Sequence, residues 1–311
     1  MKEIDSPKKS LRRRIIRGIV IGIGLLLILL GTSALSLWWY LNPTIHQEKG
    51  VVYGDRNGYP LTFDVLTPRH NSNGKGIVFL VSGKWKSNPS KIRPWIVGPI
   101  LRQGFTVFAV CHRSQPEASI IEINEDIHRA VRTIRHDASR WKIDPDHLGA
   151  SGGSSGGHLS LMLATQGGPG DPNSSDPIER ESSEVQAVAI FFPVTDLLNL
   201  GASTENAGDG GPPKSFRNAF GPGTENLAVW KEVGGSLSPI LHVTPSMPPI
   251  LIFHGDADTL VPLEQSLRFQ KAAAEKGLEV EVIRRPGKSH GWISMPLDIY
   301  RMGIWFDEHL N

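Results

Sequence analysis

The sequence predicts an α/β protein whose central sheet is mainly parallel and is covered by helices on both faces. Two observations carry this prediction. Short apolar runs that fit buried strands alternate with segments of helical periodicity, and a glycine- and serine-rich turn joins one such strand to an apolar helix. Strands that alternate with helices pair in parallel in most known folds. With 311 residues, of which 39% are hydrophobic, the chain is long enough for one large domain of this kind.

The expected elements follow one another along the body of the chain. A hairpin is expected around turn residues 55–58. The expected strands are residues 51–53, 61–65, 76–81, 105–110, 148–151, 185–192, 249–253 and 278–283. The expected helices are residues 120–141, the segment from 155 onward, 263–276 and 296–309. Because ligands bind beyond the carboxyl ends of the strands in such sheets, functional residues are expected in the loops there.

The first 41 residues differ in composition from the rest. Residues 1–17 carry a net charge of +5, which leaves −3 for the remainder of the chain. Residues 18–41 contain no charged side chain. As a helix rising about 1.5 Å per residue they would reach roughly 36 Å, enough to cross a hydrocarbon core of about 30 Å. We therefore expect a basic tail, a single transmembrane helix and a mildly acidic body without nucleic-acid partners.

The flanks of this segment predict its orientation. The basic near end favours a cytoplasmic N-terminus, and Trp38, Trp39 and Tyr40 at the far end suit the opposite membrane interface. Residues 42–311 are then expected outside the cytoplasm. A cleaved signal peptide is the alternative, because Ala34-Leu35-Ser36 places small residues at the spacing of a cleavage site, and it would give a secreted protein. The length of the apolar run favours the anchor.

Ser154 lies at the centre of the turn between the strand at 148–151 and the following helix. A serine hydroxyl is a poor nucleophile until a base takes its proton, and it must stand clear at the tip of a tight turn. Gly152 and Gly156 flank it where strand and helix crowd together. The pattern is typical of a strand-turn-helix nucleophile elbow, in which the Ser155 N–H at the helix start can bind an oxyanion.

The Gly-x-Ser-x-Gly pattern occurs twice in overlapping register, because residues 149–153 fit it with Ser151 at the centre. The strand needs residues 148–151 for its completion and the helix must begin just after the elbow, so register favours Ser154. A glycine-rich loop without chemistry is the structural alternative. A phosphate-binding loop is excluded because the Gly-Lys-Ser/Thr ending is missing.

A serine nucleophile needs a histidine base and a carboxylate that orients the histidine. Of the 11 histidines, only His290 and His309 follow the last expected strand, and His290 lies in the loop directly after it. We therefore predict His290 as the base. Asp256 and Asp258 share the loop after the preceding strand. Position favours Asp258 as the acid, with Asp256 still open and Asp196 as an outside candidate.

Three segments carry a family resemblance. Residues 152–159, Gly-Gly-Ser-Ser-Gly-Gly-His-Leu, resemble the nucleophile motif of α/β-hydrolases of the acetyl esterase/lipase group. This group includes feruloyl and acetyl-xylan esterase-like enzymes and hormone-sensitive-lipase-like esterases. Residues 254–262 resemble the acid loop of the group, and residues 141–146 resemble the segment before its elbow strand. The resemblance covers about residues 50–308. It implies an α/β-hydrolase fold, with Ser154 as nucleophile, Asp258 as acid and His290 as base.

The chain departs from this group at the oxyanion hole. Members of the group usually carry His-Gly-Gly after the strand that corresponds to residues 76–81, whereas this chain has Ser82-Gly83-Lys84-Trp85. A backbone donor does not depend on its side chain, so the amides of Gly83 and Lys84 are expected to complete the oxyanion hole with Ser155. An ordinary passage from strand to loop is the alternative.

Two further features bear on the site. Residues 199–244 interrupt the alternation of strands and helices and are rich in Gly, Pro and Ser, so we expect a cap over the site, with a surface insertion as the alternative. Cys111 is the single cysteine, so no intrachain disulfide can form, and it is expected to be a buried thiol. No cluster of His, Cys and carboxylates has metal-ligand spacing, and no cofactor is expected.

These features predict a membrane-anchored serine hydrolase that cleaves carboxylic esters, with short acyl or acetyl groups favoured by the resemblance. The substrate is expected to be a small-molecule or polysaccharide ester. Two alternatives stay open. One is a serine peptidase on the same fold, and the other is a membrane-tethered binding protein without catalysis, which only the altered oxyanion segment favours.

Overall fold

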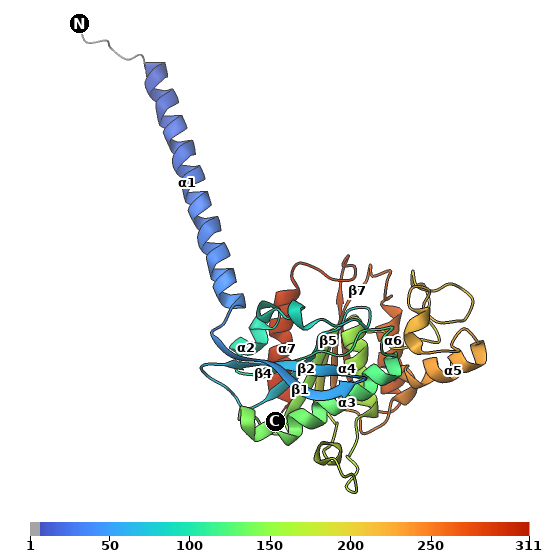
Figure 1. Ribbon diagram of the computed structural model, residues 1–311. Coiled ribbons are helices and arrows are strands. Elements are labelled where there is room, and N and C mark those ends of the chain that lie inside the picture. The colour runs from blue at the N-terminus through green and yellow to red at the C-terminus, as the bar shows by residue number, and fades with distance from the viewer. Residues whose placement is uncertain (1–6, 311) are drawn as a thin grey trace.

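The fold is an α/β fold built on one mixed sheet, as the computed structural model shows for residues 7–310 (Figure 1). Within these residues, eight strands lie in the order β1-β2-β4-β3-β5-β6-β7-β8. Their bounds are β1 (Ile45–Arg56), β2 (Tyr59–Pro68), β3 (Gly76–Leu80), β4 (Thr106–Val110), β5 (Leu148–Gly153), β6 (Ala187–Phe191), β7 (Ile250–Gly255) and β8 (Val280–Arg285). The β1–β2 and β2–β4 pairs are antiparallel, and every other pair is parallel. The predicted α/β class is confirmed.

Helices cover both faces of this sheet. Their bounds are α1 (Pro7–Leu41), α2 (Gly98–Arg102), α3 (Ile120–His136), α4 (Ser155–Gln166), α5 (Leu227–Ser236), α6 (Glu264–Ala274) and α7 (Met295–His309). Side chains of α3, α4 and α6 share one core with the strand residues that point to their face, such as Val78. Side chains of α2 and α7 share the other core, which includes Ile77. Consecutive strand residues therefore reach opposite layers.

Two helical predictions need correction. The helix expected over residues 120–141 ends at His136, and a separate 3₁₀ turn, Ala138–Trp141, follows it. The apolar pattern runs on because Ala138 and Trp141 are both buried, although the helical backbone has stopped. The short helix α2 has no counterpart among the expected elements, because five residues are too few to show a periodicity.

The N-terminal helix α1 projects from the domain (Figure 1). It begins at Pro7, inside the basic tail, while residues 1–6 of that tail lie outside the described residues. Its segment Arg14–Leu41 is long and apolar enough to cross a membrane. The far end of α1 is held by α2, because Arg102 Nε donates to the Tyr40 carbonyl at 2.7 Å and its guanidinium lies 3.8 Å from the centre of the Trp39 ring.

Candidate active site

Ser154 occupies a sharp turn between β5 and α4. Its backbone is left-handed, with φ 55° and ψ −120°, a conformation that L side chains rarely adopt. The turn is crowded, since a Cβ on Gly152 would lie 2.6 Å from the Gly156 carbonyl carbon and one on Gly156 would lie 2.7 Å from the Leu80 carbonyl oxygen. These contacts explain why glycine stands on either side. The hydroxyl is left partly exposed at the carboxyl end of the sheet.

A line of hydrogen bonds joins Ser154 to two loops that are distant in sequence. His290 Nε2 lies 2.9 Å from Ser154 Oγ, and His290 Nδ1 lies 2.7 Å from Asp258 Oδ2. Because Nδ1–H donates to the carboxylate, Nε2 is left to accept the serine proton. The other oxygen of Asp258 accepts the backbone N–H groups of Leu260 and Val261, each at 3.0 Å. Asp258 is 5% exposed, and these two bonds orient its carboxylate toward the histidine.

The structure places the alternative candidates away from this line. Ser151 is 2% exposed on β5, and its hydroxyl contacts Met302 Sδ at 4.0 Å. Asp256 accepts the Gly287 N–H at 2.7 Å, and Asp196 pairs with the Arg268 guanidinium at 3.1 Å. Neither aspartate contacts His290 in the described part of the chain.

Three backbone amides near Ser154 are expected at the oxyanion hole, and they differ in whether they already have a hydrogen-bond partner. Gly83 N–H donates to the Lys86 carbonyl at 3.0 Å, so it is already engaged. Lys84 follows with φ 57°, and within residues 7–310 its N–H has no hydrogen-bond partner. Ser155 N–H stands at the first position of α4, where the amides of a helix lack intrahelical acceptors.

Two buried histidines that sequence reasoning did not assign support this region. His112 Nδ1–H donates to the Arg113 carbonyl at 2.8 Å, so its Nε2 accepts from Ser82 Oγ at 2.9 Å. Ser82 Oγ lies 3.1 Å from Ser155 Oγ, which extends the chain of bonds to the start of α4. Ser82 thus ties the loop after β3 to the helix that follows the nucleophile.

A second hydrogen-bonded pair that holds the loop after β3 against α4 is Trp85 with His158. Trp85 Nε1–H donates to His158 Nδ1 at 3.2 Å, and His158 Nε2–H donates to the Leu237 carbonyl at 2.8 Å. Phe216 and Phe220 pack edge-on against the Trp85 ring. These contacts are made across long sequence separations, and no local pattern indicates them.

Two hollows of different size open on Ser154. The smaller holds about 40 Å³ and is bounded by Lys84 and Ser155. Its apolar walls come from Val194, Leu197, Leu200, Pro213, Phe216 and Leu260. Residues 199–244 therefore contribute directly to the walls of the site. The larger is a groove of about 840 Å³ whose lining includes His290. Its apolar lining includes Ile100 of α2 and Met295, Ile299 and Met302 of α7.

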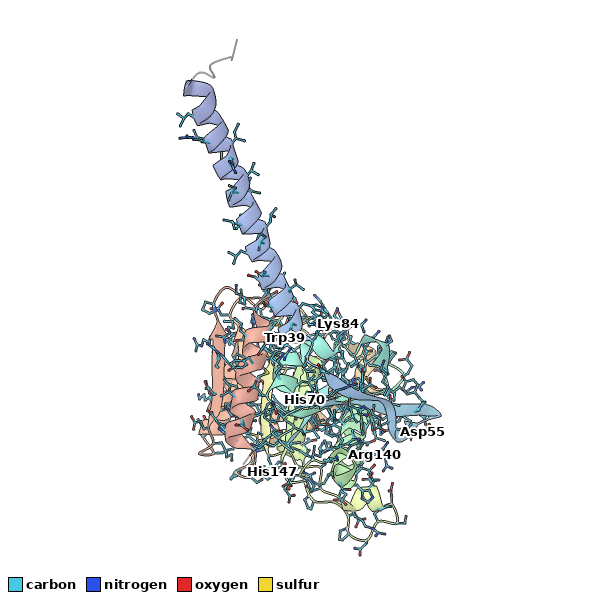
Figure 2. The ribbon with its side chains drawn as sticks, turned by 90° about the vertical axis from the view of Figure 1, so that its left-hand side faces the viewer. Trp39, Asp55, His70, Lys84, Arg140 and His147 are labelled. Atoms are coloured by element: carbon cyan, nitrogen blue, oxygen red, sulfur yellow. The ribbon has the colours of Figure 1, made fainter. Side chains whose placement is uncertain are left out.

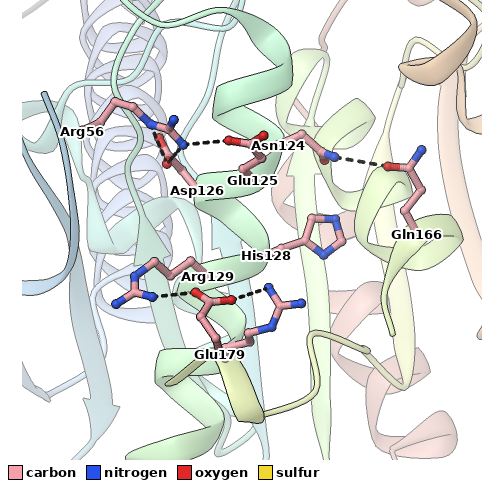
Figure 3. Close-up of a pocket in the computed structure, with 9 residues that line it drawn as sticks. Arg56, Asn124, Glu125, Asp126, His128, Arg129, Gln166 and Glu179 are labelled. Carbon is pink, nitrogen blue, oxygen red and sulfur yellow. Dashed lines mark hydrogen bonds and ion pairs between the residues drawn. The ribbon is translucent and has the colours of Figure 1, made fainter. Parts of the chain in front are cut away.

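A third hollow, of about 500 Å³, is polar and is lined by residues of β1, α3 and α4 rather than by the loops around Ser154 (Figure 3). Its charges are largely paired within it. Arg56 bonds Glu125 and Asp126 at 3.1 Å, and Arg129 bonds Glu179. His128, which lines this hollow, bonds the Ser183 hydroxyl at 3.0 Å, but Ser183 is buried and does not line the hollow, so we assign the hollow no part in the chemistry. No group of three or more potential metal ligands occurs in the described residues.

The strand order and the serine elbow are those of an α/β-hydrolase, and comparison with known proteins refines this class. A sequence model of the BD-FAE family matches residues 63–273, and the chain belongs to this family. The family resemblance predicted from the motifs is thereby confirmed.

Several of the curated relatives are esterases by name, and another is an acylamino-acid-releasing enzyme of Arabidopsis thaliana, 24% identical over 202 residues, which cover 60% of this chain and 23% of the relative. A probable isoprenylcysteine alpha-carbonyl methylesterase of Arabidopsis thaliana is 22% identical over 280 residues, which cover 89% of this chain and 57% of the relative. The probable carboxylic ester hydrolase LipM of Mycobacterium tuberculosis is 29% identical over 166 residues, which cover 53% of this chain and 37% of the relative. The chain thus spans about half the length of the curated relatives that it matches.

A solved structure agrees more fully in length. A truncated form of a carbohydrate esterase from gut microbiota superposes with a TM-score of 0.72 at 27% identity. The match covers 85% of this chain and 96% of that one. By fold and by sequence, the chain therefore belongs with esterases.

Because His112 and His158 are buried, we expect the stability of the protein to fall at acid pH. Burial lowers the pKa of His158, and likewise of His112, to about 4. The pKa of histidine in the unfolded chain is near 6.5. Between pH 6.5 and 4, these two histidines are therefore protonated in the unfolded chain and neutral in the folded chain. The free energy of unfolding should therefore fall on acidification, by about 2 kcal/mol per buried histidine at pH 5.

Urea denaturation of the full chain in detergent at pH 7.5 and pH 5 measures this effect. His158→Gln should destabilise the protein by about 2 kcal/mol less at pH 5 than at pH 7.5, because the variant has no proton to gain there. Ser160→Ala, a buried substitution on the same helix, should cost the same at both pH values. An equal penalty for His158→Gln at both pH values would refute this reading.

Proposed function

We propose that this protein hydrolyses carboxylic esters through Ser154, His290 and Asp258, with an acyl-enzyme intermediate. The observation that carries the proposal is the line of hydrogen bonds from Ser154 Oγ through His290 to Asp258, at 2.9 and 2.7 Å. Such an arrangement activates a serine for attack on an acyl carbon. The esterase relatives and the family membership support the same reaction.

The geometry defines the steps. His290 Nε2 takes the hydroxyl proton as Ser154 Oγ attacks the ester carbonyl, and Asp258 stabilises the imidazolium that forms. His290 then gives this proton to the departing alcohol oxygen, leaving the acyl group on Ser154. Water, activated by the same nitrogen, releases the acid and restores the serine.

The oxyanion that forms during attack is held by backbone amides in this proposal. The N–H groups of Lys84 and Ser155 are the two donors, while Gly83 shapes the loop, since its own N–H already bonds Lys86. The bond between Trp85 and His158 keeps the loop in place. Each donor of this kind is worth roughly a hundredfold or more in rate.

The two hollows beside Ser154 are proposed to bind the two halves of the ester, the acyl group and the alcohol. The departing alcohol must lie beside His290, which lines the large groove and not the small pocket. The acyl group then enters the small pocket beneath residues 199–244, which act as a cap. A space of about 40 Å³ is little more than the volume of one water molecule, so it suits an acetyl or similarly short acyl group. A non-catalytic binding role would not account for the hydrogen bond that aligns His290 with Ser154.

We further propose that α1 anchors the protein in a membrane, with its basic end in the cytoplasm and the hydrolase domain outside. Its large apolar side chains are exposed along the whole span, for example Leu29 at 62% and Leu30 at 57%. The contacts of Arg102 with Trp39 and Tyr40 join the helix to the domain without a break, which favours an anchor over a cleaved signal.

Hydrolysis of p-nitrophenyl esters tests the catalytic proposal. Ser154→Ala should lower the rate on p-nitrophenyl acetate by about a thousandfold or more, because no nucleophile remains. Ser151→Ala is the matched control and should keep the rate within about twofold, since that hydroxyl contacts Met302 Sδ and forms no hydrogen bond with His290. Wild type should cleave the acetate far faster than the laurate, because the acyl pocket is small. Loss of activity in Ser151→Ala alone, with Ser154→Ala active, would overturn the proposal.

Fractionation of bacterial cells tests the anchor. The intact chain of 34.1 kDa should stay in the membrane pellet after an alkaline wash, and protease added to spheroplasts should digest its domain. Leu29→Arg with Leu30→Arg should reduce membrane insertion, because each central arginine costs about 2.5–3.5 kcal/mol. Leu11→Arg, outside the uncharged stretch, should have little effect. A shorter, soluble product would instead identify a cleaved signal.

A further inference from the structure

Four exposed apolar side chains of the hydrolase domain belong to η2, α7 and the loop before α7, all of which border the groove, while others, such as Val52, Leu227 and Leu241, lie on different elements. Ile293 is 98% exposed in the loop before α7, Leu297 and Tyr300 are 67% and 43% exposed on α7, and Trp95 is 46% exposed in the 3₁₀ helix Pro94–Ile96 (η2). We call these four residues the apolar patch. Single exposed apolar residues are common, but a cluster that includes a fully exposed isoleucine indicates a contact surface.

The patch is joined to the anchor by direct contacts. Arg102, at the end of α2, bonds the Tyr40 carbonyl of α1. The next residue, Gln103, donates to the Tyr300 carbonyl of α7 at 3.0 Å. A short chain of contacts thus connects the aromatic end of the span with the middle of α7. Leu297 and Ile293 precede Tyr300, toward the end of the domain that bears Ser154.

The mouth of the site lies at the end of the domain to which α1 is attached. In Figure 2, Lys84 of the oxyanion loop and Trp39 of α1 lie at the same height at the upper end of the domain, whereas Arg140 and His147 lie at the lower end. A membrane that holds α1 would therefore adjoin the mouth of the site. Trp38 and Trp39 would mark its interface, which is the depth that such side chains prefer.

The groove suits an amphiphilic alcohol better than a sugar. Ile96 and Met295 are half-buried where η2 and the start of α7 border it, and Ile100 and Met302 line it as buried residues of α2 and α7. The side chains that η2, α2 and α7 give to the groove are all apolar and offer a sugar no hydrogen bonds, whereas polar side chains of the groove, such as Ser87, Asn88 and Ser114, come from the loops after β3 and β4. The face of α7 opposite the groove carries Leu297 of the patch, so one helix borders both.

The charges at the rim agree with an anionic surface. Lys84 and Lys86 line the groove, and no carboxylate does. Lys288 is exposed in the loop that carries His290. Among the described residues, none of these three lysines forms an ion pair, although the body of the chain is acidic overall. Basic residues beside exposed apolar ones are typical of surfaces that contact anionic lipid headgroups.

We infer that the apolar patch rests on the surface of the membrane that holds α1, and that the groove takes its substrate from that surface. The substrate class is then an amphiphilic ester, in which a short acyl group is joined to a long apolar alcohol. This inference rests on the proposed ester hydrolysis and on the proposed anchor.

Dye labelling tests the docking without any need for catalysis. The full chain is reconstituted in vesicles of phosphatidylcholine and phosphatidylglycerol, with an environment-sensitive nitrobenzoxadiazole dye on Ile293→Cys or, as control, on Leu241→Cys. Cys111 is buried, and unsubstituted protein serves as its labelling blank. Leu241 is 59% exposed and lies before the amino end of β7, away from the site. The dye at position 293 should shift to shorter wavelength and be quenched by headgroup-level spin-labelled lipid, unlike the dye at 241. Equal, water-like emission at both positions would overturn the inference.

Two esters that share an acetyl group test the substrate class. Wild type should cleave both p-nitrophenyl acetate in solution and hexadecyl acetate held in the vesicles. Ile293→Glu with Leu297→Glu should lower the vesicle rate by about tenfold, because two aliphatic contacts with lipid are lost, and leave the soluble rate within about twofold. Leu241→Glu should change neither rate.

The outcomes separate the inference from the function on which it rests. If hexadecyl acetate is not cleaved while p-nitrophenyl acetate is, or if the double variant keeps the full vesicle rate, the substrate class is refuted and the hydrolase stands. If neither ester is cleaved, the proposed function fails, and the dye at position 293 still decides the docking.

Discussion

The left-handed backbone of Ser154 is the constraint on which the rest of the site depends. A conformation of this kind persists only where its surroundings determine it fully. Here the Ser154 N–H donates to the Phe191 carbonyl of β6 at 3.1 Å, and its carbonyl accepts the His158 N–H of α4 at 2.9 Å. Gly152 and Gly156 allow strand and helix to approach closely enough for both bonds. The strain holds the hydroxyl clear of its own helix and exposed to a base.

Strand order brings His290 and Asp258, the proposed base and acid, close to this hydroxyl. β7 and β8 are neighbours in the sheet, so the loops that follow them meet at its carboxyl edge. They touch through the backbone, since the Ala257 N–H donates to the Lys288 carbonyl at 2.9 Å and a Cβ on Gly255 would lie 2.7 Å from the Lys288 carbonyl carbon. This contact fixes the separation of Asp258 and His290. The Phe192 ring, 4.3 Å from that of His290, borders the base on another side.

The sequence predicts the parts of this arrangement that have local causes. The turn has no room for Cβ atoms at positions 152 and 156, so glycine is required at both. Buried parallel strands appear in the sequence as short apolar runs. The bonds of Trp85 with His158 and of Ser82 with His112 join residues 73 and 30 positions apart, so no local pattern reveals them. Gly83 is a different case, because its amide is engaged by Lys86, only three residues along the chain, and the residue types of this loop do not indicate that bond. The end of α3 was overestimated because buried Trp141 continues the apolar pattern beyond the helix.

The site and the exposed apolar helix α1 together lead to our proposal of an ester hydrolase whose chemistry takes place at the carboxyl edge of the sheet and whose substrate arrives from the membrane that holds α1. The central claim is that Ser154 is the residue that becomes acylated. Treatment of the full chain with diisopropyl fluorophosphate, followed by tandem mass spectrometry, tests it most directly. We predict one phosphoryl adduct, on Ser154, that is lost in His290→Asn. An adduct on Ser151, or none at all, would contradict the account.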